Sequence, residues 1–239
     1  MPTLLLNIGN TNTQFARLAA DGTLSTVTMV PTEALADCAE LADLASCPGL
    51  AASVVPAAQA ALAARFPNLH FLALRDVPFV DFSAVDPSTL GADRLANLAA
   101  ATEIGAPVIV LDCGTAITTE ALGAGNRFQG GAILPGRRLL RQALHDHTAQ
   151  LPLVPLGNCE PPALGTNTAE AILAGTDAAV LGAVNHLLRR SQQTLGAPDC
   201  PVLAVGGDAP YFATHLPQVQ LGPTDFTLRG LRAIALHQR

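Results

Sequence analysis

The sequence predicts an α/β protein of two similar halves, each with the element order βββαβα. The first observation behind this prediction is a polar turn that follows an apolar strand twice. The two copies are Asn7-Ile8-Gly9-Asn10-Thr11 and Asp112-Cys113-Gly114-Thr115-Ala116. The second observation is that strands and helices follow both copies in the same order. Such a duplication predicts two domains, residues 1–104 and 105–239, with a nucleotide cleft between them.

In the first half, apolar runs and turn residues predict three consecutive strands, then a helix, a fourth strand and a second helix. We expect Thr32 to cap the first of these helices, which would end near Ala45, because Glu33 then lies in its first turn. The strands are expected at residues 3–8, 13–19, 23–30 and 50–55, and the second helix at 56–66.

The second half repeats this pattern. Strands are expected at 108–111, 115–122 and 127–134, with a turn at 123–126, and helices near 136–147 and 168–194. A late strand at 202–205 ends in Gly206-Gly207. It occupies the place that the strand ending at Pro56 takes in the first half, which supports the duplication.

Composition narrows the chemistry. The chain has no lysine, and its 13 cationic side chains are all arginine. A phosphate loop of the GK[ST] type and a Schiff-base lysine are therefore excluded. The net charge of −6 argues against a nucleic-acid partner, which would need a basic face.

The five cysteines are odd in number and include no C-x-x-C pair, which favours reduced thiols in a cytoplasmic protein. We expect no signal peptide, because no basic segment precedes the short apolar run that ends at Asn7. The longest apolar region, residues 41–64, is interrupted by Asp43, Pro48 and Pro56, so we expect no membrane span.

The paired turns are suited to binding phosphate. Glycine lets backbone N–H groups approach an anion closely, and asparagine and threonine side chains add donors. The alternative for either copy alone is ordinary tight-turn chemistry. The residues expected to bind the phosphates of a nucleotide here are Asn7, Gly9, Asn10, Thr11, Asn12, Gly114, Thr115 and Ala116.

Two carboxylates stand out beside these turns. Asp112 would lie next to phosphate oxygens, where a carboxylate favours a hard cation. Asp93 precedes Arg94 at the start of an apolar helix, so that the arginine and the helix N-terminus would keep it ionised. Phosphoryl transfer to a hydroxyl needs such a carboxylate near the acceptor. The alternative for Asp93 is a helix N-cap with a salt-bridged arginine.

The sequence resembles a known superfamily and, within it, one family. The paired turns resemble the two phosphate segments of the actin/hexokinase/Hsp70 superfamily, whose halves have a ribonuclease H-like fold. Five more segments occur in the order seen in type III pantothenate kinases, over residues 3–235. They are Gly91-Ala92-Asp93-Arg94, Gly130-Gly131-Ala132-Ile133-Leu134-Pro135-Gly136, His147-Thr148-Ala149-Gln150-Leu151-Pro152, Gly165-Thr166-Asn167-Thr168 and Gly206-Gly207-Asp208-Ala209-Pro210.

This resemblance implies a kinase that uses ATP and magnesium to phosphorylate pantothenate. Asp93 would then be the general base, and Arg94 would bind the pantothenate carboxylate next to Gly91 and Ala92. Thr168 would touch pantothenate, although it could equally cap the long helix that begins there.

The same resemblance implies further ligands and a partner. Gly206 and Gly207 would lie at the adenosine, unless they form only a strand-to-helix turn. Asp112 resembles a position linked with a monovalent cation, potassium or ammonium. A homodimer is implied through helices of the second half.

The sequence departs from the family pattern at two positions. Asn7 stands where the family has aspartate, which removes a favourable site for hydrated magnesium. Ala84 stands where many members have a tyrosine facing the pantothenate chain; Phe79, Phe82 or a partner subunit could fill that space. Three interpretations follow: an active pantothenate kinase, a kinase of the same fold with another hydroxyl acceptor, and a regulatory homologue without activity.

Overall fold

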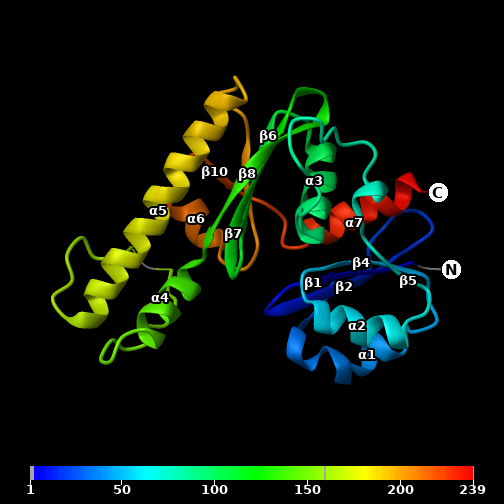
Figure 1. Ribbon diagram of the computed structural model, residues 1–239, viewed down its shortest axis with the longest axis horizontal. Helices are drawn as coiled ribbons and strands as arrows, with labels where there is room; N and C mark the ends of the chain where they lie inside the picture. The colour runs from blue at the N-terminus through cyan, green and yellow to red at the C-terminus, as the bar shows by residue number, and fades with distance from the viewer. Residues whose placement is uncertain (1–2, 159, 239) are drawn as a thin grey trace. The chain divides into compact units, whose positions relative to one another are not determined.

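The computed structural model describes residues 3–158 and 160–238, and contacts divide them into two units (Figure 1). Unit 1 comprises residues 1–106, 124–128 and 225–239, and unit 2 comprises residues 107–123 and 129–224. This division differs from the expected boundary after residue 104 mainly at the C-terminal helix, which groups with unit 1. Each unit is described by itself.

Unit 1 contains a mixed sheet in the order β3-β2-β1-β4-β5, in which β1 is antiparallel to β2 and parallel to β4. Alternation along β1 sends Leu4, Leu6 and Ile8 into one hydrophobic core with residues from the short helices that follow β3 and β4. The strands are Thr3–Ile8 (β1), Asn12–Leu18 (β2), Thr28–Pro31 (β3), Gly49–Ser53 (β4) and Leu69–Phe71 (β5).

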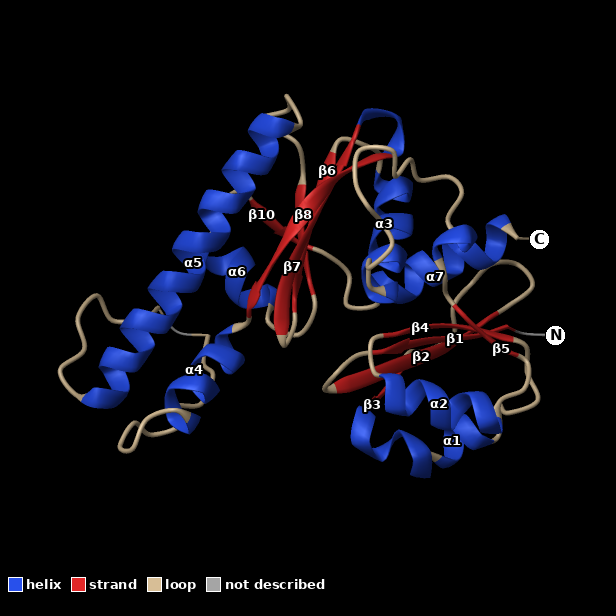
Figure 2. Ribbon diagram, in the orientation of Figure 1, coloured by secondary structure: helices blue, strands red, loops and turns tan. Residues whose placement is uncertain are grey.

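The helices of unit 1 lie on both faces of this sheet, which Figure 2 shows as α1 and α2 on one side and α7 on the other. Helices α3 and α7 cross closely, since a Cβ on Gly230 would clash with the carbonyl of Ala96. The buried Thr227 hydroxyl donates to Asn97 Oδ1 at 2.8 Å in the same contact. The helices are η1 (Thr32–Asp37), α1 (Ala39–Ala42), α2 (Pro56–Arg65), η2 (Leu74–Asp76), α3 (Ala92–Ile104) and α7 (Phe226–His237).

Unit 2 repeats the sheet of unit 1, with the order β10-β9-β6-β7-β8. Strand β6 is antiparallel to β7 and parallel to β9, as β1 is to β2 and β4. The strands are Val108–Cys113 (β6), Ala116–Gly123 (β7), Arg127–Pro135 (β8), Val202–Val205 (β9) and Val219–Leu221 (β10). The matching strand order supports the predicted duplication.

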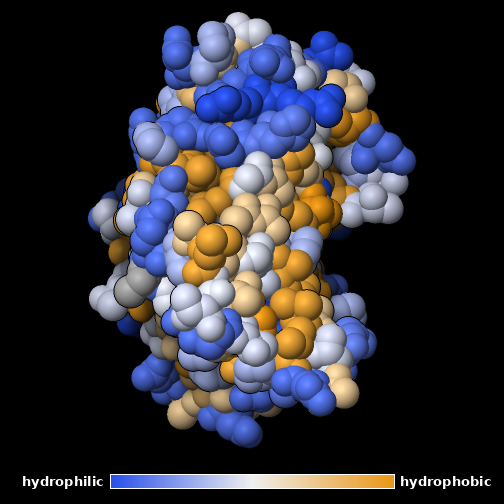
Figure 3. Space-filling model, turned by 90° about the vertical axis from the view of Figure 1, so that its left-hand side faces the viewer, coloured by the Kyte–Doolittle hydropathy of each residue, from blue (hydrophilic) through white to orange (hydrophobic). Residues whose placement is uncertain are grey.

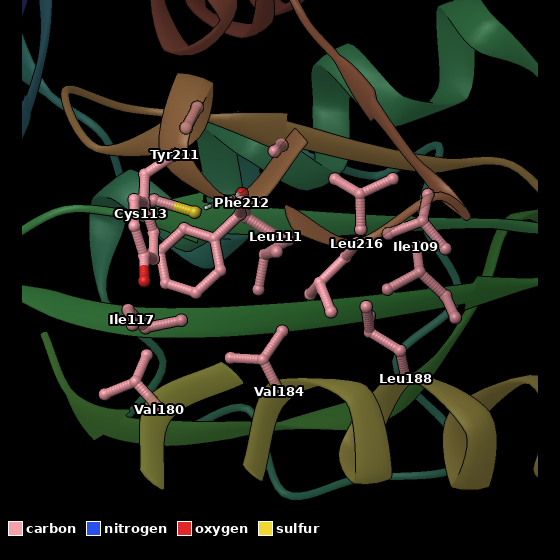
Figure 4. Packing of buried hydrophobic residues seen from close by; sticks show 14 of the residues in the cluster. Ile109, Leu111, Cys113, Ile117, Val180, Val184, Leu188, Tyr211, Phe212 and Leu216 are labelled. Atoms are coloured by element: carbon pink, nitrogen blue, oxygen red, sulfur yellow. Dashed lines mark hydrogen bonds between the residues drawn. The ribbon is translucent and has the colours of Figure 1, made fainter. Parts of the chain in front are cut away.

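Helices α5 and α6 pack on one face of the second sheet (Figure 4). Val180, Val184 and Leu188 recur every four residues along α5 and point at Ile117, Phe212 and their neighbours, as a helical stripe should. The helices of unit 2 are α4 (Arg137–Asp146), α5 (Thr168–Thr194) and α6 (Ala209–His215), whereas η3 (Ala124–Asn126) groups with unit 1.

One expected element is wrong in detail. Thr32 does not cap a long helix: the helical segments there are a 3₁₀ turn and the four-residue α1, and the cap residue is Pro31. The Thr32 hydroxyl instead donates to the carbonyl of Gly9 at 2.7 Å. The third strand is also shorter than expected, because regular pairing with β2 begins only at Thr28.

Candidate active site

In unit 1, the first polar turn lies between β1 and β2. The N–H of Gly9 donates to the carbonyl of Asn12 at 3.0 Å, and the N–H of Thr32 donates to the carbonyl of Thr11 at 2.9 Å. Asn10, Thr11 and Asn12 are exposed, whereas Asn7 is half-buried at the end of β1. The turn therefore presents amide and hydroxyl groups to solvent from a fixed backbone.

In unit 2, the second turn has the same closing bonds with one residue fewer. The N–H of Gly114 donates to the carbonyl of Ala116 at 3.0 Å, and the N–H of Gly136 donates to the carbonyl of Thr115 at 2.9 Å. Gly114, Thr115 and Ala116 are exposed. This turn offers the uncovered peptide groups that an anion site requires.

The second turn lies against the glycine pair that follows β9. Gly206 has a φ of +89°, and a Cβ at this position would be 2.7 Å from Asp112 Oδ1, so only glycine fits without strain. A Cβ on Gly207 would meet no atom within 4 Å. The structure thus brings Asp112 and the Gly206-Gly207 pair together within one unit, as a bound nucleotide would need.

Asp112, the expected cation ligand, is a half-buried residue of β6. Among residues 3–158 and 160–238, no three His, Cys, Asp or Glu side chains gather as a metal site. A cation that binds beside the phosphates of a nucleotide needs few protein carboxylates, because phosphate oxygens and waters complete its shell. A single half-buried carboxylate beside open backbone fits that requirement.

Asp93, the expected general base, is the second residue of α3 in unit 1. Its Oδ1 accepts the N–H of Arg94 at 2.7 Å, and a Cβ on Gly91 would be only 2.6 Å from the same oxygen. The N-cap of α3 is Gly91, so the interpretation of Asp93 as an N-cap is wrong. Gly91 leaves the room in which the carboxylate lies.

The pKa of Asp93 is shifted upward, although Arg94 and the helix N-terminus favour the ionised form. Burial raises the pKa of this carboxyl above its ordinary value of 3.8. Arg94 lowers the pKa through its hydrogen bond and its positive charge, but by less than burial raises it. A raised pKa increases the basicity of the ionised form, which favours a role in proton transfer.

Aromatic rings lie beside Arg94 in unit 1. The guanidinium carbon is 5.9 Å from the centroid of Phe128, and Phe82 meets the same ring edge-on at 6.2 Å. Phe79 packs instead on His237 of α7, 4.9 Å between centroids. Of the two phenylalanines considered for the space at Ala84, Phe82 therefore contacts the ring that lies beside Arg94. The sequence analysis missed Phe128, since it begins a strand and has no motif around it.

Thr168 is the first residue of α5, but it does not cap the helix. The cap is Asn167, whose Oδ1 accepts the N–H of Glu170 at 3.0 Å. The capping role considered for Thr168 is therefore wrong. Thr168 is exposed and lines a hollow of about 580 Å³ between α4 and α5.

Comparisons with known proteins decide the family. The family model for type III pantothenate kinase matches residues 3–190. A type III pantothenate kinase from Akkermansia muciniphila is 32% identical over 243 residues, with 98% of each chain covered. The chain belongs to the type III pantothenate kinase family. The matched residues include the turns at Asn7 and Asp112 and the segment that carries Asp93.

Other relatives match over a shorter stretch. A type III pantothenate kinase from Rubrobacter xylanophilus is 40% identical over 154 residues, which are 62% of this chain and 58% of the relative. The matched region thus spans less than two thirds of the length of that curated relative.

Solved structures agree on the architecture of a two-domain, actin-like kinase fold. A Baf family transcriptional activator from Campylobacter jejuni superposes with a TM-score of 0.67 at 19% identity, with 98% of each chain covered. A 2-dehydro-3-deoxygalactonokinase from Sinorhizobium meliloti gives 0.60 at 18% identity, with 98% and 96% covered. At these identities the likeness shows the fold alone.

Proposed function

We propose that this protein phosphorylates pantothenate with ATP to give 4′-phosphopantothenate, the first step of coenzyme A biosynthesis. The observation that carries the proposal is the Gly91–Arg94 segment. It presents a half-buried carboxylate of raised pKa beside an arginine, in a chain of the type III pantothenate kinase family. A base and a carboxylate-binding cation are the two groups that this acceptor needs.

In the proposed reaction, the Asp93 carboxylate accepts the proton of the primary hydroxyl of pantothenate. The hydroxyl oxygen forms a bond to the γ-phosphorus as the bond to the β,γ-bridging oxygen breaks, and ADP leaves. Arg94 binds the pantothenate carboxylate, and Gly91 and Ala92 line the acceptor beside it.

The nucleotide is assigned to the turns. Asn7, Gly9 and the Asn10–Asn12 run from unit 1, with Gly114, Thr115 and Ala116 from unit 2, would donate to the phosphates. Gly206 and Gly207 would lie along the adenosine. Magnesium carried by ATP would neutralise phosphate charge, and Asp112 would bind a monovalent cation, potassium or ammonium, beside it.

Two further candidate functions rest on specific residues. Ala84 is smaller than the tyrosine that many family members have at this position, which favours a different small hydroxyl acceptor. Asn7 provides an uncharged amide where an aspartate would attract magnesium, which favours a regulatory homologue that binds nucleotide without turnover.

We also propose that the protein is a cytoplasmic homodimer. Figure 3 shows apolar residues gathered on the face that carries α4 and α5. Leu139 is 43% exposed, and the hollow between the two helices is lined mainly by Leu, Ile and Ala. Helix α5 is also long and apolar enough to cross a membrane, which is the alternative to burial of this face in a dimer.

Size-exclusion chromatography with light scattering, without detergent, separates these two outcomes. A protein with a membrane-spanning helix would aggregate, whereas a dimer would have twice the mass of the chain.

The experiment that tests the function is an acceptor screen. Purified protein receives ATP, magnesium, potassium and pantothenate, and mass spectrometry follows the products beside the Asn7→Asp variant. We expect ADP and 4′-phosphopantothenate in equal amounts from the wild type, and a faster reaction from the variant. Product from another hydroxyl alone would favour the second function, and nucleotide binding without product from either protein would favour the third.

A further inference from the structure

A buried charged cluster lies in unit 2, outside the residues assigned to substrate. Arg137 and Arg141 are each 1% exposed, and because they are four residues apart they share one face of α4. Both bind Asp177 of α5, which is 2% exposed. Buried charges are costly unless they are closely paired, so the geometry of such a cluster is tightly constrained.

The guanidinium of Arg137 is held on every side. Its Nε and Nη2 donate to the two Asp177 oxygens at 3.2 and 3.3 Å, and Nη1 donates to Asp208 Oδ1 at 2.9 Å. Nη2 also donates to the carbonyl of Gly157 at 2.6 Å. The guanidinium carbon lies 3.3 Å from the centroid of the Tyr211 ring. Because the guanidinium group is planar and rigid, several hydrogen bonds to it fix its partners in direction as well as in distance.

Asp208 connects this cluster to the glycine pair. It directly follows Gly207, and its N–H donates to the carbonyl of Cys113 at 3.0 Å, beside Asp112. Aspartate often caps a helix with its side chain, but at the start of α6 the Asp208 side chain makes no cap bond and binds Arg137 instead. Burial raises the pKa of Asp208 despite the nearby Arg137 charge.

The backbone next to Arg137 contacts the other nucleotide segment. The N–H of Gly136 donates to the carbonyl of Thr115, and a Cβ on Gly136 would be 2.7 Å from that oxygen. Consecutive residues thus reach both segments, Gly136 through its backbone and Arg137 through its side chain.

We infer that Arg137 is a positioning residue for the nucleotide: through Asp208 it fixes the Gly206–Asp208 segment relative to the Asp112–Thr115 turn, and so sets the affinity for ATP. The inference rests on the proposed function only in taking an adenine nucleotide as the ligand. Arg137 itself touches no substrate in this account.

Arg141 provides a matched control within the same cluster. Its Nη2 donates to Asp177 Oδ1 at 2.7 Å and its Nη1 to the carbonyl of Pro155 at 2.5 Å. These contacts join α4 to α5 and to the following loop, and not to the glycine pair. A purely structural cluster would make both arginines matter equally for nucleotide affinity.

The test is calorimetric titration of full-length protein with a non-hydrolysable ATP analogue and magnesium. Asp208→Asn is the main variant, because it leaves Arg137 paired with Asp177 and should fold. We expect its dissociation constant to rise about four- to tenfold, because the amide oxygen accepts a weaker hydrogen bond from Arg137 than the carboxylate does. Arg141→Gln should lower the melting temperature but keep the dissociation constant within about twofold of wild type.

Steady-state kinetics adds a second readout: Asp208→Asn should raise KM for ATP and leave KM for pantothenate unchanged. Unchanged analogue affinity in Asp208→Asn overturns the inference, and so does an equal loss of affinity in Arg141→Gln. If the wild type binds the analogue but forms no product, the proposed function fails while the titration still tests Arg137. A wild type that binds no analogue overturns both.

Discussion

The two polar turns have the same closing bonds and different surroundings. Both turns accept a backbone bond, from the N–H of Thr32 in unit 1 and from the N–H of Gly136 in unit 2. In unit 1 the Thr32 hydroxyl adds a side-chain bond to the carbonyl of Gly9. The strand that ends beside each turn differs as well. In unit 1, β4 ends at Ser53 and Val54 follows it. In unit 2, β9 ends at Val205, and Gly206 and Gly207 follow it.

This difference shows how duplicated halves take different tasks. Val54 fills the edge of the first sheet and lies 3.7 Å from where a Cβ on Gly91 would be, next to the segment that carries Asp93. In the second sheet the glycine pair leaves that edge open beside Asp112. The first edge is thus suited to the acceptor side of the reaction, and the second to the nucleotide.

The largest expected effect is on Asp93, in the half assigned to the acceptor. Asp93→Asn should lower kcat by about 10²–10⁴-fold, the usual contribution of a general base, with ATP-analogue affinity unchanged. Steady-state kinetics and calorimetry measure the two effects. Because burial opposes ionisation of this carboxyl, the variant should not unfold more easily at neutral pH. Equal loss of kcat and of nucleotide affinity would contradict the division between halves.

The next effect tests the open edge of unit 2. Gly206→Ala places a side chain at a φ of +89° and against Asp112, so we expect a loss of about 1–3 kcal/mol of unfolding free energy and weaker analogue binding. Denaturant unfolding and calorimetry check this. Gly207→Ala is the control, because its Cβ meets nothing within 4 Å, and its unfolding free energy should be nearly that of wild type. Indistinguishable unfolding curves for the two variants would show that the Gly206 geometry is not required.

The pH dependence of the reaction sharpens the assignment of Asp93. The base must be ionised to accept a proton, and its pKa is raised above 3.8. We therefore expect kcat/KM for pantothenate to fall as the pH drops through that raised pKa, and the acid limb to be absent from the residual activity of Asp93→Asn. An acid limb that persists in the variant would assign the titration to another group.

The smallest effect concerns the side chain that holds the first turn. Thr32→Val removes the hydroxyl that bonds Gly9, at a cost of about 1 kcal/mol in unfolding free energy. KM for ATP should rise modestly if the turn donates to phosphate as proposed. Thr214→Val is a control, since that hydroxyl bonds only the helix carbonyl of Pro210. Equal effects on KM would argue against a special role for the first turn.

Much of the fold could be predicted because hydrophobic periodicity and turn residues are local signals. Strands β1, β6 and β9 and helices α4 and α5 lie within a few residues of their expected positions. The missed elements are short or depend on distant partners. Strands β5 and β10 have three residues each, and α7 packs on α3 from the other end of the chain.

The candidate site divides in the same way. Its turns and the Asp93 segment have motifs and could be found from sequence. The rest could not: the bond from Thr32 to Gly9 spans 23 residues, and that from Arg137 to Asp208 spans 71. Nothing in the sequence near Arg137 and Arg141 indicates that they are buried and paired with Asp177.

The most direct test of the central claim is product analysis after incubation of the wild type with ATP, magnesium, potassium and pantothenate, with Asp93→Asn run in parallel. The account predicts one 4′-phosphopantothenate for each ADP from the wild type and almost none from the variant. Equal product from both proteins, or ADP release that does not depend on pantothenate, would contradict it.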